Sequence, residues 1–204
     1  MLSGQLRGNL WMEEGMDVLE ELTRVGAVLH GHFELSSGRH SDVYFEKFRL
    51  LEQPAVLREL CRQLVEPFAD QCVQLVVGPT IGGALVACEA AGALGVQARY
   101  LERSGSGGRE LRRGAVIPEG TRVLLVDDVL TTGLSLQECL LVLRSAELIG
   151  IAVLIARTES PVQLPVAVHA LATLQAPSYA ASECPMCHQG VPITKPGSRG
   201  LLTG

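Results

Sequence analysis

Two adjacent carboxylates and a turn rich in hydroxyl groups form the stretch of this sequence that is best suited to chemistry. Asp127 and Asp128 follow an apolar run, residues 123–126, and a Thr-Thr-Gly turn follows at residues 131–133. The apolar run is typical of a buried strand. A small-residue turn that leads into a helix binds anions, because the first N–H groups of a helix have no carbonyl partner. Residues 123–135 therefore predict carboxylates beside a phosphate seat, which suits a phosphorylated sugar.

A second strand-to-helix joint is rich in glycine. The apolar residues 73–77 lead into Gly-Pro-Thr-Ile-Gly-Gly at positions 78–83. Glycine permits a positive φ and a close approach of backbone to ligand. The joint lacks the Gly-Lys-Ser/Thr of a P-loop, and the chain contains no Gly-x-Gly-x-x-Gly fingerprint. Tight packing is the commoner use of such a joint, and a second phosphate seat is the alternative.

Residues 102–114 contain four glycines, four arginines and almost nothing apolar. A segment of this composition cannot bury itself, so we expect it to be mobile. It is either an exposed hairpin or a cationic lid that closes over an anionic ligand. Arg103 and Arg109 are the first candidates for the lid, ahead of Arg112 and Arg113.

The surrounding elements alternate between strands and helices. Apolar stripes predict helices at residues 18–25, 54–69, 84–94 and 133–148, and a hairpin spans residues 33–51 around Ser37, Gly38 and Arg39. Apolar runs predict strands at residues 73–77, 96–101, 122–127, 151–156 and 166–174, the last at an edge because Pro165 precedes it. This order predicts an α/β fold, a mostly parallel central sheet flanked by helices, with the ligand at the carboxyl ends of the strands. Loops 78–83, 102–114 and 127–135 and Arg157 would all lie there.

Length and composition fit one globular domain. The chain has 204 residues, of which 47% are hydrophobic and 19% charged. Its net charge of −5 argues against a nucleic-acid partner, which would require a basic face. No apolar run approaches the roughly 20 residues of a membrane span, and the N-terminus lacks an apolar signal core. We therefore expect a cytoplasmic protein, with residues 1–15 as an extension for which disorder is one option.

Six cysteines do not amount to a disulfide scaffold. Cys61, Cys72, Cys88 and Cys139 have apolar neighbours in the sequence, which predicts reduced and buried thiols. Cys184 and Cys187 form a Cys-x-x-Cys followed by a histidine, a pattern that suggests zinc. A structural zinc site needs four ligands, however, and the sequence identifies no complete set. Cys184 and Cys187 thus remain zinc candidates only.

Residues 126–133, Val-Asp-Asp-Val-Leu-Thr-Thr-Gly, resemble the ribose-phosphate signature of type I phosphoribosyltransferases. The pattern from Phe33 to Tyr44, Phe-x-Leu-x-Ser-Gly-Arg-x-Ser-x-x-Tyr, is similar to the N-terminal hood of the orotate phosphoribosyltransferase family. The resemblance implies transfer of the phosphoribosyl group of phosphoribosyl pyrophosphate to orotate, with Mg²⁺, in de novo pyrimidine biosynthesis. It also implies a homodimer in which a loop reaches the partner's site. The domain would span residues 16–188, with the hood at 16–51 and a tail at 189–204.

The resemblance also implies roles for individual residues. Asp127 and Asp128 would hold the ribose hydroxyls and, with Arg103, act as the catalytic residues. The ribose-5-phosphate set comprises Asp127, Asp128, Val129, Leu130, Thr131, Thr132, Gly133, Leu134 and Ser135. The pyrophosphate set comprises Thr80, Ile81, Gly82, Gly83, Arg103 and Arg109. The orotate set comprises Ser36, Ser37, Thr131 and Arg157, with Arg157 on the carboxylate of the base.

The chain departs from many relatives at three cationic positions. Ser36 and Gly82 stand where those relatives place lysines, and the 102–114 loop contains arginines in place of lysines and a histidine. Arginine can replace lysine as a phosphate-binding cation, but serine and glycine cannot. Either the chain has fewer cations around its site or its substrate differs. A transferase for uracil or a purine, and a regulator that binds phosphoribosyl pyrophosphate without turnover, are the alternative functions.

Overall fold

The computed structural model describes residues 17–35, 37–105, 107–157, 162–174 and 176–196. The predicted extension at residues 1–15, the orotate candidate Ser36 and the last part of the predicted tail, residues 197–204, lie outside the described residues. Among the residues described, no helix has both the length and the apolar character needed to cross a membrane.

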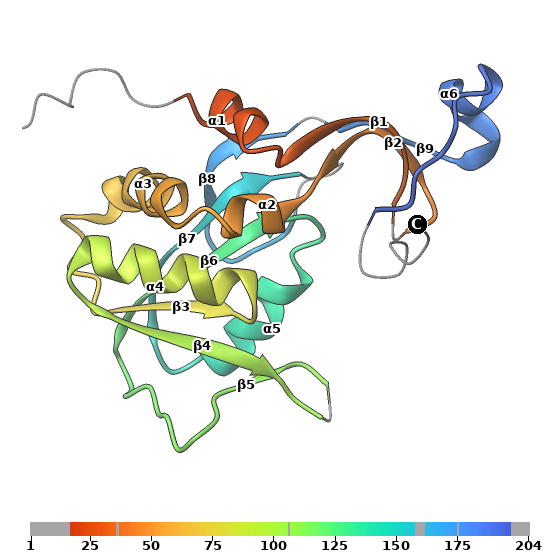
Figure 1. The fold of residues 1–204 in the computed structure, drawn as a ribbon. Helices are drawn as coiled ribbons and strands as arrows, with labels where there is room; N and C mark the ends of the chain where they lie inside the picture. The colour runs from red at the N-terminus through yellow and green to blue at the C-terminus, as the bar shows by residue number, and fades with distance from the viewer. Residues whose placement is uncertain (1–16, 36, 106, 158–161, 175, 197–204) are drawn as a thin grey trace, which may run out of the picture.

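A six-stranded sheet forms the centre of the molecule (Figure 1), with the strand order β5-β4-β3-β6-β7-β8. Every neighbouring pair is parallel except β4 and β5, which form an antiparallel hairpin. The α/β fold with a mostly parallel sheet is confirmed, and the strand after Pro165 does lie at an edge. The strands are β3 (Leu75–Pro79), β4 (Gln97–Arg103), β5 (Arg109–Glu110), β6 (Arg122–Leu130), β7 (Glu147–Ala156) and β8 (Val168–Thr173).

Helices cover both faces of this sheet. On one face, Leu124 and Val126 of β6 pack in a core with helices α3 and α4, and on the other face Val123 and Leu125 pack with helix α5. Successive residues of a strand point to opposite faces, so a strand covered on both sides must be apolar throughout. The helices are α1 (Val18–Arg24), α2 (Lys47–Leu51), α3 (Pro54–Val65), α4 (Gly82–Leu94), α5 (Leu134–Val142) and α6 (Pro185–His188), with 3-10 turns at Glu66–Phe68 and Ala181–Glu183.

The hood, which we define as strands β1 (Val28–Glu34), β2 (His40–Phe45) and β9 (Ser178–Tyr179), extends away from the central sheet (Figure 1). β1 and β2 form the predicted antiparallel hairpin, and β9 pairs with β2. The segment after His188, predicted as a tail, lies along β1. There the N–H of Glu34 donates to the carbonyl of Thr194 at 2.9 Å, and the N–H of Thr194 donates to the carbonyl of His32 at 2.8 Å.

Three predicted boundaries are wrong. Residues 47–51, predicted as part of the hairpin, form helix α2, which begins after Glu46 accepts a hydrogen bond from the N–H of Phe48 at 3.3 Å. The helix predicted to reach residue 148 ends at Val142, because Glu147 and Leu148 pair with β6. β6 continues to Leu130, so the acid pair lies within the strand. Strand pairing between segments that are far apart in the sequence determines the end of α5 and the end of β6, and no local pattern encodes such pairing.

The prediction that four cysteines are buried is half correct. Cys61 and Cys139 are buried in the two cores, whereas Cys72 and Cys88 are exposed. All six cysteines are free thiols. Burial raises the pKa of both the Cys61 and the Cys139 thiol to about 12, so these two groups behave as small apolar side chains.

Candidate active site

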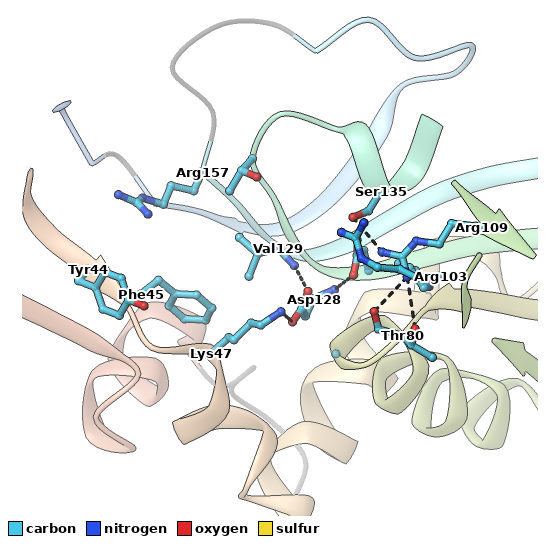
Figure 2. Close-up of a pocket in the computed structure, with 14 residues that line it drawn as sticks. Tyr44, Phe45, Lys47, Thr80, Arg103, Arg109, Asp128, Val129, Ser135 and Arg157 are labelled. Carbon is cyan, nitrogen blue, oxygen red and sulfur yellow. Dashed lines mark hydrogen bonds and ion pairs between the residues drawn. The ribbon is translucent and has the colours of Figure 1, made fainter. Parts of the chain in front are cut away.

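A cleft of about 440 Å³ opens at the carboxyl ends of the strands of the central sheet (Figure 2). This position and size are typical of ligand sites in α/β folds. It brings together the hood, the β3–α4 joint, the β4–β5 hairpin, the acid stretch and the end of β7. The lining residues are Tyr44, Phe45, Lys47, Pro79, Thr80, Gly82, Arg103, Arg109, Asp127, Asp128, Val129, Thr131, Ser135 and Arg157.

The acid pair lies in the middle of the cleft. Asp127 Oδ1 accepts a hydrogen bond from the N–H of Asp128, and Asp128 Oδ1 accepts one from the N–H of Val129, both at 2.9 Å. The two residues are 6% and 5% exposed. Burial, together with the neighbouring Asp128 carboxylate, raises the pKa of Asp127 well above its ordinary value. The fold thus holds two carboxylates where they repel each other, which is typical of functional sites.

Lys47 is a cleft residue that the sequence analysis missed. Its Nζ lies 2.9 Å from Asp128 Oδ2, an oxygen with no hydrogen bond of good geometry among the described residues. The predicted hairpin placed Lys47 in a strand, whereas it is the first residue of α2, beside the cleft (Figure 2). Lys47 and Lys195 are the two lysines of the sequence, and this scarcity was a signal that could have singled it out. A cation therefore does face the acid pair, although Gly82 and Ser36 are not lysines.

The glycines of the β3–α4 joint bring backbone against the acid pair. A Cβ at Gly82 would lie 1.9 Å from Asp128 Oδ2, and one at Gly83 would lie 2.8 Å from Asp127 Oδ1. Both distances are too short for any side chain. The glycines of this joint therefore serve tight packing, and the surface on which they pack is the acid pair of the cleft.

The predicted phosphate turn leads into α5 as expected. Gly133 has φ 78°, a left-handed conformation that favours glycine, and it caps the helix N-terminus. Thr131 and Ser135 line the cleft together with Asp127, Asp128 and Val129. The other predicted members of this set are not among the lining side chains: Leu130, Thr132, Gly133 and Leu134. Of these four, Leu130 and Gly133 are buried and Thr132 and Leu134 are exposed.

Arg109 connects the two predicted phosphate-binding loops. Its side chain is 3% exposed and forms an ion pair with Glu138 of α5 at 3.2 Å. It also donates to the carbonyl of Thr80 at 3.1 Å and to Ser135 Oγ at 3.4 Å. Arg109 is therefore part of the wall of the cleft and not a solvated cation of a lid.

The remaining arginines of the β4–β5 region differ in environment. Arg103, predicted to cover the ligand, is exposed and lines the cleft. Arg112 pairs with Glu110 at 2.9 Å, and Arg113 pairs with Glu102 at 3.4 Å, both away from the cleft lining. From the predicted pyrophosphate set, four residues line the cleft: Thr80, Gly82, Arg103 and Arg109. Ile81 is exposed and Gly83 is buried, and neither lines the cleft.

Arg157 lies at the opposite end of the cleft from the two predicted phosphate-binding loops (Figure 2). Its N–H donates to the carbonyl of Leu130 at 2.8 Å, which anchors the end of β7 beside the acid stretch. Tyr44 and Phe45 of the hood lie at the same end. Burial raises the pKa of the Tyr44 hydroxyl, so this group stays a hydrogen-bond donor at neutral pH. Ser37, predicted to bind orotate, is exposed in the β1–β2 turn and does not line the cleft.

Comparisons with known proteins identify the family of this chain. A family model described as "Phosphoribosyl transferase domain" matches residues 49–164. Orotate phosphoribosyltransferases from Desulforamulus reducens and Pelotomaculum thermopropionicum are 41% and 43% identical to the chain, each over 91% of it, and the matches cover 97% and 98% of those proteins. The crystal structure of orotate phosphoribosyltransferase from Aeropyrum pernix matches with a TM-score of 0.63 and 30% identity, over 77% of this chain and 93% of that one.

Proposed function

The chain belongs to the orotate phosphoribosyltransferase family, and on that premise we propose how its cleft transfers the phosphoribosyl group of phosphoribosyl pyrophosphate to orotate. One observation carries the proposal: a buried acid pair lies between Arg157 at one end of the cleft and the β3–α4 joint with the start of α5 at the other. The substrates have the same layout, with an anionic base, a ribose and two phosphate-bearing ends.

The acid pair serves the ribose and the charge that develops on it. Breaking the bond between C1 of the sugar and pyrophosphate builds positive charge on the ring, while a nitrogen of orotate approaches to form the new bond. Asp127 and Asp128 are fixed by backbone N–H groups, so they need no reorganisation to face that charge. Lys47 pairs with Asp128 and holds its carboxylate in place until the substrate hydroxyls arrive.

The two loops bind the phosphates. Thr131, Ser135 and the first N–H groups of α5 bind the 5′-phosphate, and the β3–α4 joint with Arg103 receives the pyrophosphate. Arg109 acts as a positioning residue, because its guanidinium fixes Thr80 and Ser135 relative to each other. Arg103 neutralises the charge of the departing pyrophosphate, and its exposed hairpin covers the cleft and excludes water.

The far end of the cleft binds the base. Arg157 pairs with the carboxylate of orotate, since a guanidinium is the best partner for a planar carboxylate. Tyr44 supplies a donor beside it, and Phe45 supplies an apolar wall. Among the described residues that line this end, none is acidic, which favours an anionic base over a neutral purine.

The acid pair also suits Mg²⁺. Asp128 Oδ2 is buried without a hydrogen bond of good geometry among the described residues, and carboxylate oxygens are the ligands that Mg²⁺ prefers. Asp127 and Asp128 would hold the ion together with substrate oxygens. When bound, Mg²⁺ supplies positive charge to the pyrophosphate as it leaves.

We also propose a homodimer, in which the tip of the β4–β5 hairpin reaches the partner's site. Large apolar side chains near this hairpin support it: Tyr100 is 43% exposed and Val116 is 75% exposed. Light scattering coupled to size-exclusion chromatography measures the assembly state, and a monomer at assay concentration would contradict the proposal.

A base panel tests the function. The chain is supplied with a fixed concentration of phosphoribosyl pyrophosphate and Mg²⁺, together with orotate, uracil, hypoxanthine or adenine, and pyrophosphate release is measured. Of the four bases, we expect only orotate to cause pyrophosphate release, and we expect no release by the Asp128→Asn variant. Turnover with a purine or uracil but not orotate would reassign the base, and binding of phosphoribosyl pyrophosphate without any turnover would make the chain a regulator.

A further inference from the structure

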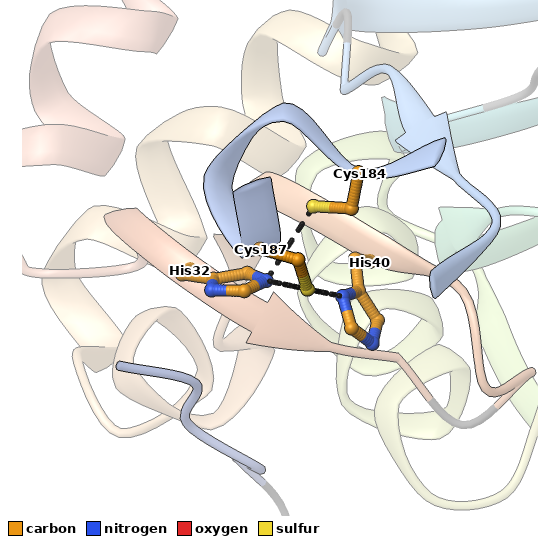
Figure 3. A group of neighbouring side chains, drawn as sticks. All are labelled: His32, His40, Cys184 and Cys187. Atoms are coloured by element: carbon orange, nitrogen blue, oxygen red, sulfur yellow. Dashed lines mark hydrogen bonds between the residues drawn. The ribbon is translucent and has the colours of Figure 1, made fainter. Parts of the chain in front are cut away.

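Four side chains with metal-binding atoms meet on the hood, outside the cleft (Figure 3). His32 comes from β1 and His40 from β2, while Cys184 is the N-cap of α6 and Cys187 lies within that helix. Their ligand atoms all lie within 4.8 Å of one another, although 152 positions separate His32 from Cys184. We call this group the hood cluster. The sequence analysis singled out its two cysteines, but the proposed function uses none of its members.

The distances within the hood cluster match a tetrahedral metal site. Zinc bonds of about 2.0–2.1 Å to nitrogen and 2.3 Å to sulfur place two nitrogens about 3.3 Å apart, and a sulfur and a nitrogen about 3.6 Å apart. His32 Nε2 lies 3.0 Å from His40 Nδ1 and 3.5 Å from Cys184 Sγ. Cys187 Sγ lies 3.6 Å from His32 Nε2 and 3.2 Å from His40 Nδ1. Four of the six distances among these atoms are thus close to the spacing that a zinc ion imposes, and all six are within 4.8 Å.

A hydrogen bond on the other ring nitrogen of His32 supports the same conclusion. Its Nδ1 lies 2.8 Å from the carbonyl oxygen of Val191, which can only accept, so Nδ1 carries the proton. In the neutral imidazole, Nε2 then directs a lone pair into the cluster, and a backbone carbonyl on the other ring nitrogen is the usual way in which proteins orient a metal-bound histidine. One lone pair cannot accept hydrogen bonds from His40, Cys184 and Cys187 together, whereas one cation accepts an electron pair from all four side chains.

Burial makes the cluster a closed site. His32 is 3% exposed, His40 is 6% exposed and Cys184 is fully buried, while Cys187 forms the outer wall. Four protein ligands leave no open position for a substrate, which is typical of a structural zinc site. Two sulfurs and two nitrogens as ligands select zinc over magnesium or calcium, which prefer oxygen.

We propose that His32, His40, Cys184 and Cys187 bind one structural Zn²⁺, which fastens the C-terminal segment to the hood hairpin. Helix α6 has four residues, too few to be stable in isolation. Val191 and Ile193 after it are 39% and 42% exposed, so apolar burial holds this segment weakly. The ion adds the missing cross-link between segments from the two ends of the chain. This role is independent of the proposed function.

Metal content tests the proposal directly. The full chain is purified under reducing conditions without added metal, and zinc is measured by inductively coupled plasma mass spectrometry. We expect about one zinc per chain, and we expect Co²⁺ introduced in its place to show the visible absorption of a tetrahedral site with thiolate-to-metal charge transfer. Removing the metal should lower the melting temperature, and adding Zn²⁺ should restore it. A folded, reduced chain that contains no zinc and binds neither Zn²⁺ nor Co²⁺ would overturn the proposal.

Matched variants identify the ligands. His32→Ala and Cys187→Ser should lose zinc. His30→Ala, an exposed histidine on the same strand, and Cys88→Ser, an exposed cysteine on α4, should retain it. His188→Ala is the sharpest control, because His188 adjoins the Cys-x-x-Cys motif but its Nε2 lies 3.2 Å from the Ser182 carbonyl.

Loss of zinc from His188→Ala with retention by His32→Ala would overturn the assignment of ligands. If the ligand variants do not fold, the Co²⁺ spectrum of the unmodified chain decides, since thiolate charge transfer at a tetrahedral site needs no variant. A Co²⁺ spectrum without thiolate bands would then reject the site.

Discussion

In the cleft, the acid pair and the phosphate turn come from one continuous stretch, residues 127–135, whereas the hood cluster draws its four side chains from two strands and a helix at opposite ends of the chain. The cleft holds two like charges close together and faces them with Lys47. The hood cluster combines two imidazoles and two thiols around one point. The two carboxylates of the cleft repel each other until substrates bind, whereas the hood cluster needs only a single cation to be complete.

We expect the cleft to determine turnover and the hood cluster to determine stability. Variants in the cleft should change turnover without loss of stability, while loss of the hood cluster should lower the melting temperature. Five variants test this separation, and the largest expected effect comes first.

Asp128→Asn should reduce kcat by roughly 100-fold or more, because it removes a fixed negative charge that faces the developing positive charge of the ribose. The melting temperature and the zinc content should not fall. Steady-state pyrophosphate release and thermal unfolding measure the two effects. Asp42→Asn, an exposed aspartate on β2, is the matched control and should leave both unchanged. Near-normal turnover in Asp128→Asn would remove Asp128 from its assigned role.

Gly82→Ala should reduce kcat on the order of 10- to 100-fold, because its Cβ would lie 1.9 Å from Asp128 Oδ2 and must displace that carboxylate. Gly92→Ala in the same helix is the control, since a Cβ there meets no atom within 4 Å. That control should gain about 0.5–1 kcal/mol of stability through alanine's helix propensity. Equal activity of both variants would show that the close approach does not matter to turnover.

Arg157→Ala should raise the KM for orotate about ten- to hundredfold, the usual cost of losing a charged hydrogen-bond partner. The KM for phosphoribosyl pyrophosphate should change little, since Arg157 lies at the other end of the cleft. Varying each substrate in turn at saturating levels of the other separates the two constants. If both constants rise together, Arg157 does not recognise the base.

Asp127→Asn should raise the melting temperature at neutral pH while it reduces turnover. Burial and Asp128 raise the pKa of Asp127 in the folded protein above its unfolded value, so stability is lost as pH rises from about 4 through the raised pKa. Asparagine removes this loss and still accepts the hydrogen bond from the N–H of Asp128. Unfolding measured as a function of pH should therefore show a gain at neutral pH that disappears below about pH 4. A gain that is independent of pH would contradict this cause.

Lys195→Met should lower the free energy of unfolding by less than about 1 kcal/mol, because exposed ion pairs contribute little. Lys195 Nζ lies 2.7 Å from Glu34 Oε2 and joins the C-terminal segment to β1, but its side chain is 65% exposed. Chemical denaturation measures the change. A loss as large as that caused by zinc removal would show that this ion pair, and not the hood cluster, fastens the segment.

The sequence predicted the parts of the site whose signals are local. Residues 123–135 contain the apolar strand, both acids and the turn, so strand, charge and helix start could all be inferred from neighbouring positions. The edge position of β8 followed from Pro165, and the parallel sheet followed from alternation of elements. Lys47 was missed, because its role depends on where α2 lies against β6 and not on its own neighbours.

The hood cluster marks the other limit of sequence analysis. The spacing of Cys184 and Cys187 suggested a metal site, but the adjacent His188 is not part of the hood cluster, because its side chain contacts the Ser182 carbonyl. His32 and His40 show no motif, and their approach to the cysteines results from the pairing of β1, β2 and the C-terminal segment.

The sequence by itself thus determined the strand, turn and charge pattern of the cleft, because backbone preferences and apolar periodicity act over a few residues. Only the tertiary structure decided which cation faces Asp128, which loop Arg109 fixes, and which histidines join the cysteines. Those contacts depend on packing between segments that are far apart in the chain.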